Sequence, residues 1–505
     1  MRAKVCDFLS LSAILLLCVI FAALALNGLF VTCVVETGFS ADNNEHVLFL
    51  RDNVARNLAA LAAGAVCVWL VLKCRVTRRM NQIAAIGMLC CVTAVGVCWV
   101  SAAKALPYAD AKFILSDAAQ AASHVNALSE SAYLKKYPFQ TGFLLYAECM
   151  TRLFGNSSAV VMQYCNILFV SLAYLALIGI ARRLFQDERI ELLTILLLLL
   201  CLQPVFLCTF VYGTLPGLAL ALWGVYAAVR YIQERGLIWM LAAALLTAVA
   251  VVLKKNYALV TIACGIALLL NALRGRAARP LLLCAVLAIC AALAPVLVQK
   301  SYEARAQTSF GRGLPQSAWL AMGLGESSMC SGWHNAQLAV DFAESGYDYA
   351  RSDAAFRHQA RERAQLLLSR PRYLGSFFYH KLTSQWNTPS FQSIWSSAAG
   401  GHAGALPPLA ESLYSGSGAR IIERYFDVYT QLVYCGFTCA LILLCRKKRR
   451  TDARLILPLA VLGAFLYHAV FEAKAQYALP YLPMLLPYCA YAFVTLRDRL
   501  QRRAG

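Results

Sequence analysis

Two acidic residues stand close to an apolar segment, where ionisable side chains are rare enough to suggest chemistry. Asp110 comes a few residues after an apolar run, and Asp117 follows seven residues later, two turns along a helix. A carboxylate at the boundary between water and lipid can accept a proton from a hydroxyl group. The alternative is a solvated loop charge or a helix cap, so both interpretations stay open.

Lysines occur in two places where an anion could bind. Lys135 and Lys136 precede Tyr137 in a proline-stiffened turn, and they could hold a lipid phosphate or simply anchor the chain at the interface. Lys254 and Lys255 form a tight basic turn between two apolar runs. The charge pattern described below places this turn on the cation-poor side, so an anionic phosphate is a candidate ligand.

A third group of polar residues lies near the end of the chain. His468, Glu472 and Gln476 are spaced by four, so they share one face if a helix continues through them. Lys474 and Tyr477 lie in the same stretch. Such a polar stripe exceeds what capping a helix requires, which indicates a pocket.

The composition shows which elements must position these residues. Of 505 residues, 60% are hydrophobic and only 14% are charged, against about 25% in soluble proteins, so a soluble globular chain and a disordered chain are both excluded. Runs of about 17 to 25 apolar residues can cross a bilayer as helices. Twelve such runs lie at 9–35, 54–72, 83–103, 159–180, 190–211, 213–229, 237–253, 257–273, 281–299, 426–445, 455–471 and 477–495. The sequence therefore predicts an all-α polytopic membrane bundle of about twelve transmembrane helices.

The first apolar run has two interpretations. Residues Ala23, Leu24 and Ala25 resemble the cleavage site of a signal peptide. Because the apolar stretch continues to Val35, a retained signal-anchor is the preferred interpretation.

The net charge of +20 is distributed unevenly between the connecting segments. The set that includes both termini carries 24 Lys and Arg against 7 Asp and Glu, whereas the other set carries 22 against 19. Positive charge is concentrated in cytoplasmic loops, so both termini are predicted to be cytoplasmic in a multi-pass cell-membrane protein. The basic run 446–450 then serves orientation, and no nucleic-acid partner is expected.

This topology divides the chain into five parts. We expect N-terminal transmembrane helices over 1–103, a first large extracytoplasmic loop over 104–158, a central bundle over 159–299, a second large loop over 300–425, and C-terminal helices with a basic cytoplasmic tail over 426–505. Such long loops are usually functional. Any chemistry should therefore lie at the outer membrane surface.

The second large loop is predicted to contain two helices. One covers Asp353–Leu368. Ser369 would cap the next helix, with Pro371 in its first turn. Aromatic residues with basic edges between Tyr373 and Lys381 suit a helix lying on the membrane, although packing beneath the loop is an equal alternative.

Cysteine adds little. The spacing of the 20 cysteines does not suggest a zinc site, and most lie inside apolar runs. Cys149 and Cys330 are the main extracytoplasmic pair that could form a disulfide.

Several short motifs together resemble a known family. They are Asp110 with the alanine-rich stretch behind it, Tyr137-Pro138 with Gly142, Trp319 to Leu324, Gly332 to Asn335, and Phe471 to Pro480. Spread over about residues 83–495, this pattern resembles the multi-spanning glycosyltransferases of the GT-C superfamily, related to protein O-mannosyltransferases and aminoarabinose transferases. The resemblance implies sugar transfer, with inversion, from a polyprenyl-phosphate donor to a cell-envelope acceptor: a polymer, a lipid or a protein.

The resemblance also implies roles for individual residues. Asp110 matches the family's catalytic carboxylate, with Asp117 and Glu472 as candidates for a second acid. The family's second carboxylate usually lies beside the first, but here Ala111 follows Asp110, so a divalent metal is left open and no cofactor is certain.

The predicted phosphate and substrate residues follow in the same way. The lysine-proline element of the family falls near Lys136, and the usual Arg-Tyr pair is Gln476-Tyr477, which shifts the phosphate role to Lys474. The predicted donor phosphate site is Lys136, Lys254, Lys255 and Lys474. Tyr137, His468, Gln476 and Tyr477 would line the donor and acceptor pocket. Membrane lipids are expected partners of the protein as a whole.

Two other classes stay open. A polysaccharide polymerase or ligase usually depends on Arg and His in its outer loop, and this chain offers His334, His358, His380, Arg370 and Arg372. A lipid-linked oligosaccharide flippase or other transporter would need polar groups along a path through the bundle. The nearly uncharged centres of the apolar runs argue against that path.

Overall fold

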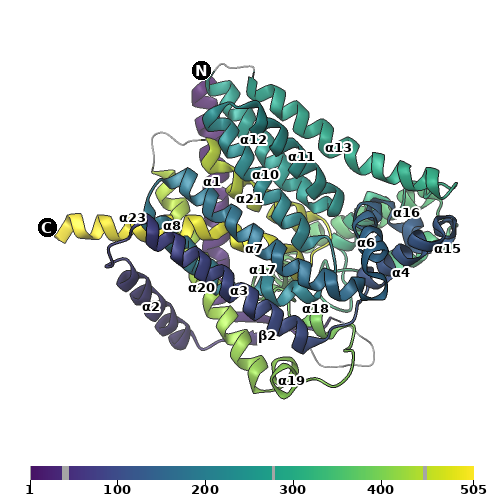
Figure 1. The fold of residues 1–505 in the computed structure, drawn as a ribbon, viewed down its shortest axis with the longest axis horizontal. Helices are drawn as coiled ribbons and strands as arrows, with labels where there is room; N and C mark the ends of the chain where they lie inside the picture. Colours follow the sequence, from purple (N-terminus) through teal and green to yellow (C-terminus); the bar gives the residue numbers. More distant parts are fainter. Residues whose placement is uncertain (1, 37–44, 276–278, 447–451, 505) are drawn as a thin grey trace.

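The computed structural model describes residues 2–36, 45–275, 279–446 and 452–504. The long helices lie side by side, whereas α4, α15 and α16 gather at the end opposite the C-terminus (Figure 1). The helices are α1 (Arg2–Gly28), α2 (Val54–Val71), α3 (Arg78–Ala103), α4 (Asp110–Ser123), α5 (Ala132–Lys136), α6 (Thr141–Phe154), α7 (Ser158–Phe185), α8 (Glu188–Leu200), α9 (Gln203–Phe206), α10 (Thr214–Glu234), α11 (Leu237–Leu253), α12 (Ala258–Gly275), α13 (Arg279–Arg305), α14 (Gln316–Leu324), α15 (Gln337–Glu344), α16 (Tyr349–Ser369), α17 (Pro371–Trp386), α18 (Trp395–Ala398), α19 (Pro408–Ser415), α20 (Ser417–Cys445), α21 (Ile456–Val470), α22 (Ala475–Ala478) and α23 (Leu482–Ala504).

The predicted membrane bundle is confirmed. Within the described residues, eleven helical segments are long and apolar enough to span a bilayer, and α11 is a shorter apolar helix of 17 residues. Together they account for the twelve runs predicted from the sequence. The predicted helix at 353–368 is also present, as α16.

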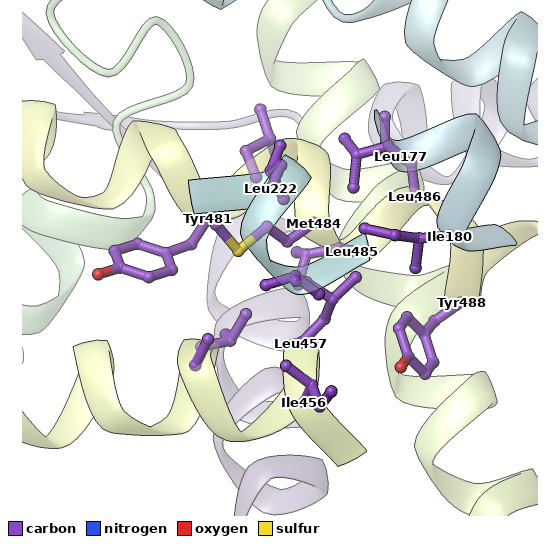
Figure 2. Close-up of a cluster of buried hydrophobic side chains, with 14 of the residues drawn as sticks. Leu177, Ile180, Leu222, Ile456, Leu457, Tyr481, Met484, Leu485, Leu486 and Tyr488 are labelled. Carbon is purple, nitrogen blue, oxygen red and sulfur yellow. The ribbon is translucent and has the colours of Figure 1, made fainter. Parts of the chain in front are cut away.

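The core of the bundle is formed where α7, α10, α21 and α23 meet. Figure 2 shows aliphatic and aromatic side chains from these helices interdigitating, including Leu177, Leu222, Leu457 and Met484. All four are 1% exposed or less. In a bilayer the surrounding lipid is as apolar as these side chains, so close packing rather than exclusion of water holds the helices together.

The first predicted span is too long. Helix α1 ends at Gly28, and residues Val31–Val35 instead form strand β1, which pairs antiparallel with β2 (Val47–Arg51). The physical reason is local: Asn27-Gly28 is a poor continuation of a helix, and the valine-rich segment that follows favours an extended backbone. The hairpin extends from the end of α1 along α17, where Cys33 donates its amide N–H to Asn387.

One prediction about a helix boundary is also wrong, and the condition placed on a second helix is not met. Ser369 is the last residue of α16, and Arg370 occupies the N-cap position of α17. The helix carrying His468 does not continue through Glu472, because α21 ends at Val470. Beyond that point Glu472 donates its amide N–H to Trp319, and buried Lys381 donates to the carbonyls of Ala469 and Phe471. Tertiary hydrogen bonds thus replace those of the helix.

Candidate functional site

A cavity of about 400 Å³ lies where α4, the α11–α12 turn, the α21–α22 loop and the α14 region meet. It brings together nine of the residues predicted for the site. They are Asp110, Tyr137, Lys254, Lys255, His468, Glu472, Lys474, Gln476 and Tyr477. The cavity therefore collects residues that are as much as 367 positions apart in the sequence.

Asp110 is the first residue of α4 and is half-buried at the cavity wall. Ala109 before it has a φ of +47°, a backbone conformation that costs an alanine on the order of 1 kcal/mol. This turn lets the helix start at Asp110, and the unpaired N–H groups of its first turn favour a negative charge there. The strained turn thus presents a carboxylate to the cavity.

Lys254 and Lys255 face the same cavity from the turn that follows α11. The Nζ of Lys254 donates to Oγ1 of Thr214 at 2.6 Å and lies 4.8 Å from the ring centre of Tyr212. Burial lowers the pKa of Lys254 to about 7, although the charge of Asp110 opposes that shift. Lys254 therefore changes charge near neutral pH.

The turn is held in place by a glycine. A Cβ on Gly213 would lie 2.0 Å from the carbonyl oxygen of Leu253. Only a residue without a side chain allows this approach. The contact fixes Lys254 next to Tyr212, which also accepts a hydrogen bond from the amide of Gln140.

Lys474 is paired with a residue from the other end of the chain. Its ammonium group contacts the carboxylate of Glu45, which is 3% exposed, and it lies 5.6 Å from the ring centre of Trp395. Burial opposes the charge of Lys474, but the Glu45 carboxylate outweighs it and raises the pKa of the lysine. The positive charge of Lys474 is therefore largely compensated before any ligand binds.

Glu472 and His334 form a second ionisable pair in the cavity wall. The Oε1 of Glu472 lies 3.4 Å from Nδ1 of His334 and accepts a hydrogen bond from the hydroxyl of Tyr477 at 3.3 Å. Burial favours the neutral acid, but His334 outweighs it, so the pKa of Glu472 is lowered. The carboxylate and the imidazole therefore each favour the charged form of the other.

The remaining predicted pocket residues are held by their neighbours. His468 is buried, its Nδ1 lies 2.8 Å from the carbonyl oxygen of Glu472, and its ring stacks on Tyr477. Gln476 donates from its side chain to the hydroxyl of Ser396 at 3.2 Å. These contacts shape the wall of the cavity.

Two predicted residues lie outside the cavity lining. Asp117 is buried on α4 and accepts a hydrogen bond from Ser131 at 2.8 Å. Burial raises the pKa of Asp117 to about 6, against the effect of that hydrogen bond. The backbone carbonyl of Lys136 accepts from Leu314, and its side chain does not line the cavity.

Sequence reasoning missed several residues of this wall. The sequence suggests His334 only for a competing class of protein, and Tyr212 lies in the one-residue break between the predicted spans 190–211 and 213–229. A charged or aromatic residue beside an expected outer turn is the signal that would have included them. Glu45 offers no such signal, because only the fold brings the hairpin to Lys474.

Neither the suggested disulfide nor a cluster of metal-binding side chains is found among the described residues. Cys149 and Cys330 are both free, so the suggested disulfide is absent. Within the described ranges, no three His, Cys, Asp or Glu residues are grouped so that they could hold a metal ion. A divalent metal stays a prediction that rests on the resemblance alone.

The fold and the cavity define a polytopic membrane protein whose charged pocket is built from its connecting loops. Residues 141–298 match the family of dolichyl-phosphate-mannose-protein mannosyltransferases. This match confirms the resemblance predicted from the sequence, to membrane glycosyltransferases of the GT-C type.

Seven chains of solved structures match, among them the apo form of the oligosaccharyltransferase of Archaeoglobus fulgidus. The two chains are 13% identical with a TM-score of 0.46, and the alignment covers 85% of this chain. This chain spans about half (52%) of the length of that protein. No curated protein matches the sequence significantly.

Proposed function

We propose that the protein transfers a sugar, with inversion at C1, from a polyprenyl-phosphate donor to an extracytoplasmic acceptor of the cell envelope. The observation that carries the proposal is the meeting of the Asp110 carboxylate with Lys254 and Lys255 in a single cavity beside an apolar helix face. Asp110 is the proposed base, and Lys254 and Lys255 are the proposed phosphate ligands.

A lipid tail also has a place beside this site. The cavity lining continues over Ala258, Leu259 and Ile262 at the start of α12. Ile262 is 56% exposed, and the same helix face continues as exposed Ile266, Leu269 and Leu273. In a membrane this apolar stripe faces lipid, so a polyprenyl chain could lie along it while its phosphate reaches Lys255.

The chemistry is consistent with the residues present. Asp110 takes the proton of the acceptor hydroxyl, whose oxygen attacks C1 of the sugar as the bond to the phosphate oxygen breaks. The bonding electrons remain on the phosphate, and cationic side chains stabilise that charge. One attack on the face opposite the leaving group inverts C1.

The competing classes have weaker support. Of the residues that favoured a polymerase or ligase, only His334 lies among the cavity-lining residues of the described chain. His358 is 74% exposed on α16, with Glu362 as its ion-pair partner. No feature of the described residues favours a lipid-linked oligosaccharide flippase or another transporter.

The test uses the purified protein in liposomes with a radiolabelled polyprenyl-phosphate sugar and an envelope extract as acceptor. We expect transfer by the natural protein and a loss of at least about 100-fold in Asp110→Asn, because a positioned base contributes roughly 10²–10⁴ in rate. Asp117→Asn, in the same helix but outside the cavity, is the matched control and should retain transfer. Near-normal turnover by the Asp110 variant would refute the assignment of the base.

A further inference from the structure

A phosphate that leaves the sugar gains a negative charge, and an ion pair or burial disfavours free positive charge on the lysines of the cavity. Burial lowers the pKa of Lys255. Lys474 is already paired with Glu45. Lys254 is half-buried, and its removal from water lowers its pKa to about 7. A third cationic or proton-donating group would complete the site.

His334 has the geometry for this role. It follows Gly332, whose φ of +71° and close approach to Lys381 turn the chain toward the cavity. Its Nδ1 faces Glu472, which leaves Nε2 as the ring nitrogen that can reach a ligand. The side chain is 34% exposed and lines the cavity, whereas Glu472 behind it is only 7% exposed.

Glu472 is itself fixed, so it can orient the imidazole. Its amide N–H donates to Trp319, the next amide donates to Gly332, and Tyr477 donates to its carboxylate. These bonds tie the two loops that carry the pair to each other. A carboxylate held behind an imidazole in this way sets the ring orientation and stabilises the imidazolium form.

We propose that His334, positioned by Glu472, is the group that donates a proton to the leaving phosphate. This proposal rests on the proposed function. As the bond between C1 and the phosphate oxygen breaks, its electron pair stays on that oxygen. Nε2 of His334 gives its proton to the phosphate, while Asp110 takes the proton of the acceptor. The products are the glycosylated acceptor, a hydrogen phosphate monoester and neutral His334, and solvent then resets both groups.

The electrostatic surroundings favour the charged imidazole. Burial works against it, but Glu472 outweighs burial and the pKa of His334 is raised above its ordinary value. The other charged groups that act on His334 are Lys474, which opposes the shift, and Asp110, which supports it. The imidazole therefore keeps its proton to a higher pH than an ordinary histidine and loses it as the pH rises further.

The experiment compares kcat at saturating polyprenyl-phosphate sugar for the natural protein and for His334→Gln from pH 6 to pH 9. A glutamine can still donate to Glu472 but cannot give up a proton. We expect kcat to fall about 100-fold at pH 6.5. The ratio of the two kcat values should shrink at high pH, because the natural imidazole is then neutral too. Glu472→Gln should show an intermediate loss and move the alkaline limb to lower pH.

A matched control is available in the same loop, because His358 and Glu362 form a similar pair on the exposed surface. His358→Gln should leave kcat unchanged. An unchanged kcat in His334→Gln would overturn the proposal, as would a loss that is the same at every pH, since a structural role predicts the latter. Failure of the natural protein to transfer any sugar would instead refute the proposed function itself.

Discussion

At the scale of single residues, the cavity holds positive charges in three different states. Lys474 is compensated by Glu45, Lys254 is half-buried and donates to the hydroxyl of Thr214, and His334 is paired with Glu472. Lysine count alone would suggest a strongly positive pocket. The actual charge available to a phosphate depends on the partner of each side chain.

Lys254 gives a prediction about pH. Its folded-state pKa of about 7 lies below the ordinary value of 10.5, so it is charged below pH 7 and neutral above. Lys254→Met should therefore lower kcat/KM for the donor about tenfold at pH 6, and this difference should shrink above pH 8. The measurement is kcat/KM across that range, because this ratio reports on the free enzyme.

Lys136→Met is the control for this experiment, since Lys136 lies outside the cavity lining. Its kcat/KM should follow that of the natural protein at every pH. A loss in the Lys254 variant that persists unchanged at pH 9 would mean that the lysine acts through packing and not through its charge.

At the scale of elements, the C-terminal half of α4 is held by an ion-pair cluster. Glu148 of α6 binds Arg305 of α13 at 2.6 Å and Arg152 at 2.7 Å, and Arg152 also donates to the carbonyl of Ala121 on α4. This cluster holds the C-terminal half of α4 while Asp110 occupies its N-terminus. The position of the carboxylate thus depends on the packing of three helices.

The contact between Gly213 and the end of α11 leads to a prediction at this scale. A methyl group on residue 213 would lie 2.0 Å from a backbone oxygen, so the Lys254 turn must shift. Gly213→Ala should destabilise the protein by about 1–3 kcal/mol and raise the KM for the donor. Thermal unfolding in detergent measures the first effect and steady-state kinetics the second.

Gly87→Ala provides the comparison, because a Cβ at Gly87 meets no atom within 4 Å. This change lies inside α3 and should leave stability unchanged or slightly higher, since alanine favours a helix more than glycine does. If both variants unfold at the same temperature as the natural protein, the close contact at Gly213 does not position the turn.

At the scale of the whole molecule, the distribution of charge predicts the orientation in the membrane. If the eleven long apolar segments of the described residues and the shorter α11 all cross the bilayer, both termini are predicted to lie on the basic side and the cavity to face away from the cytoplasm. A fluorescent protein fused to the C-terminus should therefore fold and fluoresce in the cytoplasm. A glycan-acceptor tag inserted near 402–406, between α18 and α19, should be modified on the opposite side. Modification of a C-terminal tag would contradict the topology.

Much of the architecture was predictable because the bilayer imposes a strong rule. A segment without water must satisfy its own backbone hydrogen bonds, so length and hydropathy identify the helices. Length and hydropathy do not determine where a span ends near the interface. The sequence therefore predicts a span through Val31–Val35, although these residues form a strand. The end of α21 at Val470 could not be predicted from the sequence either, because the hydrogen-bond partners of Glu472 and Phe471 come from distant segments.

The membrane bundle, the resemblance to GT-C glycosyltransferases and nine residues of the cavity wall follow from the sequence, because these depend on residue types and local spacing. The partners of the charged groups come from the tertiary structure. It brings Glu45 to Lys474 and His334 to Glu472, and it leaves Lys254 half-buried. Such pairings join segments more than 130 positions apart, and electrostatic interactions depend on distance in space and on burial, which a linear sequence does not contain.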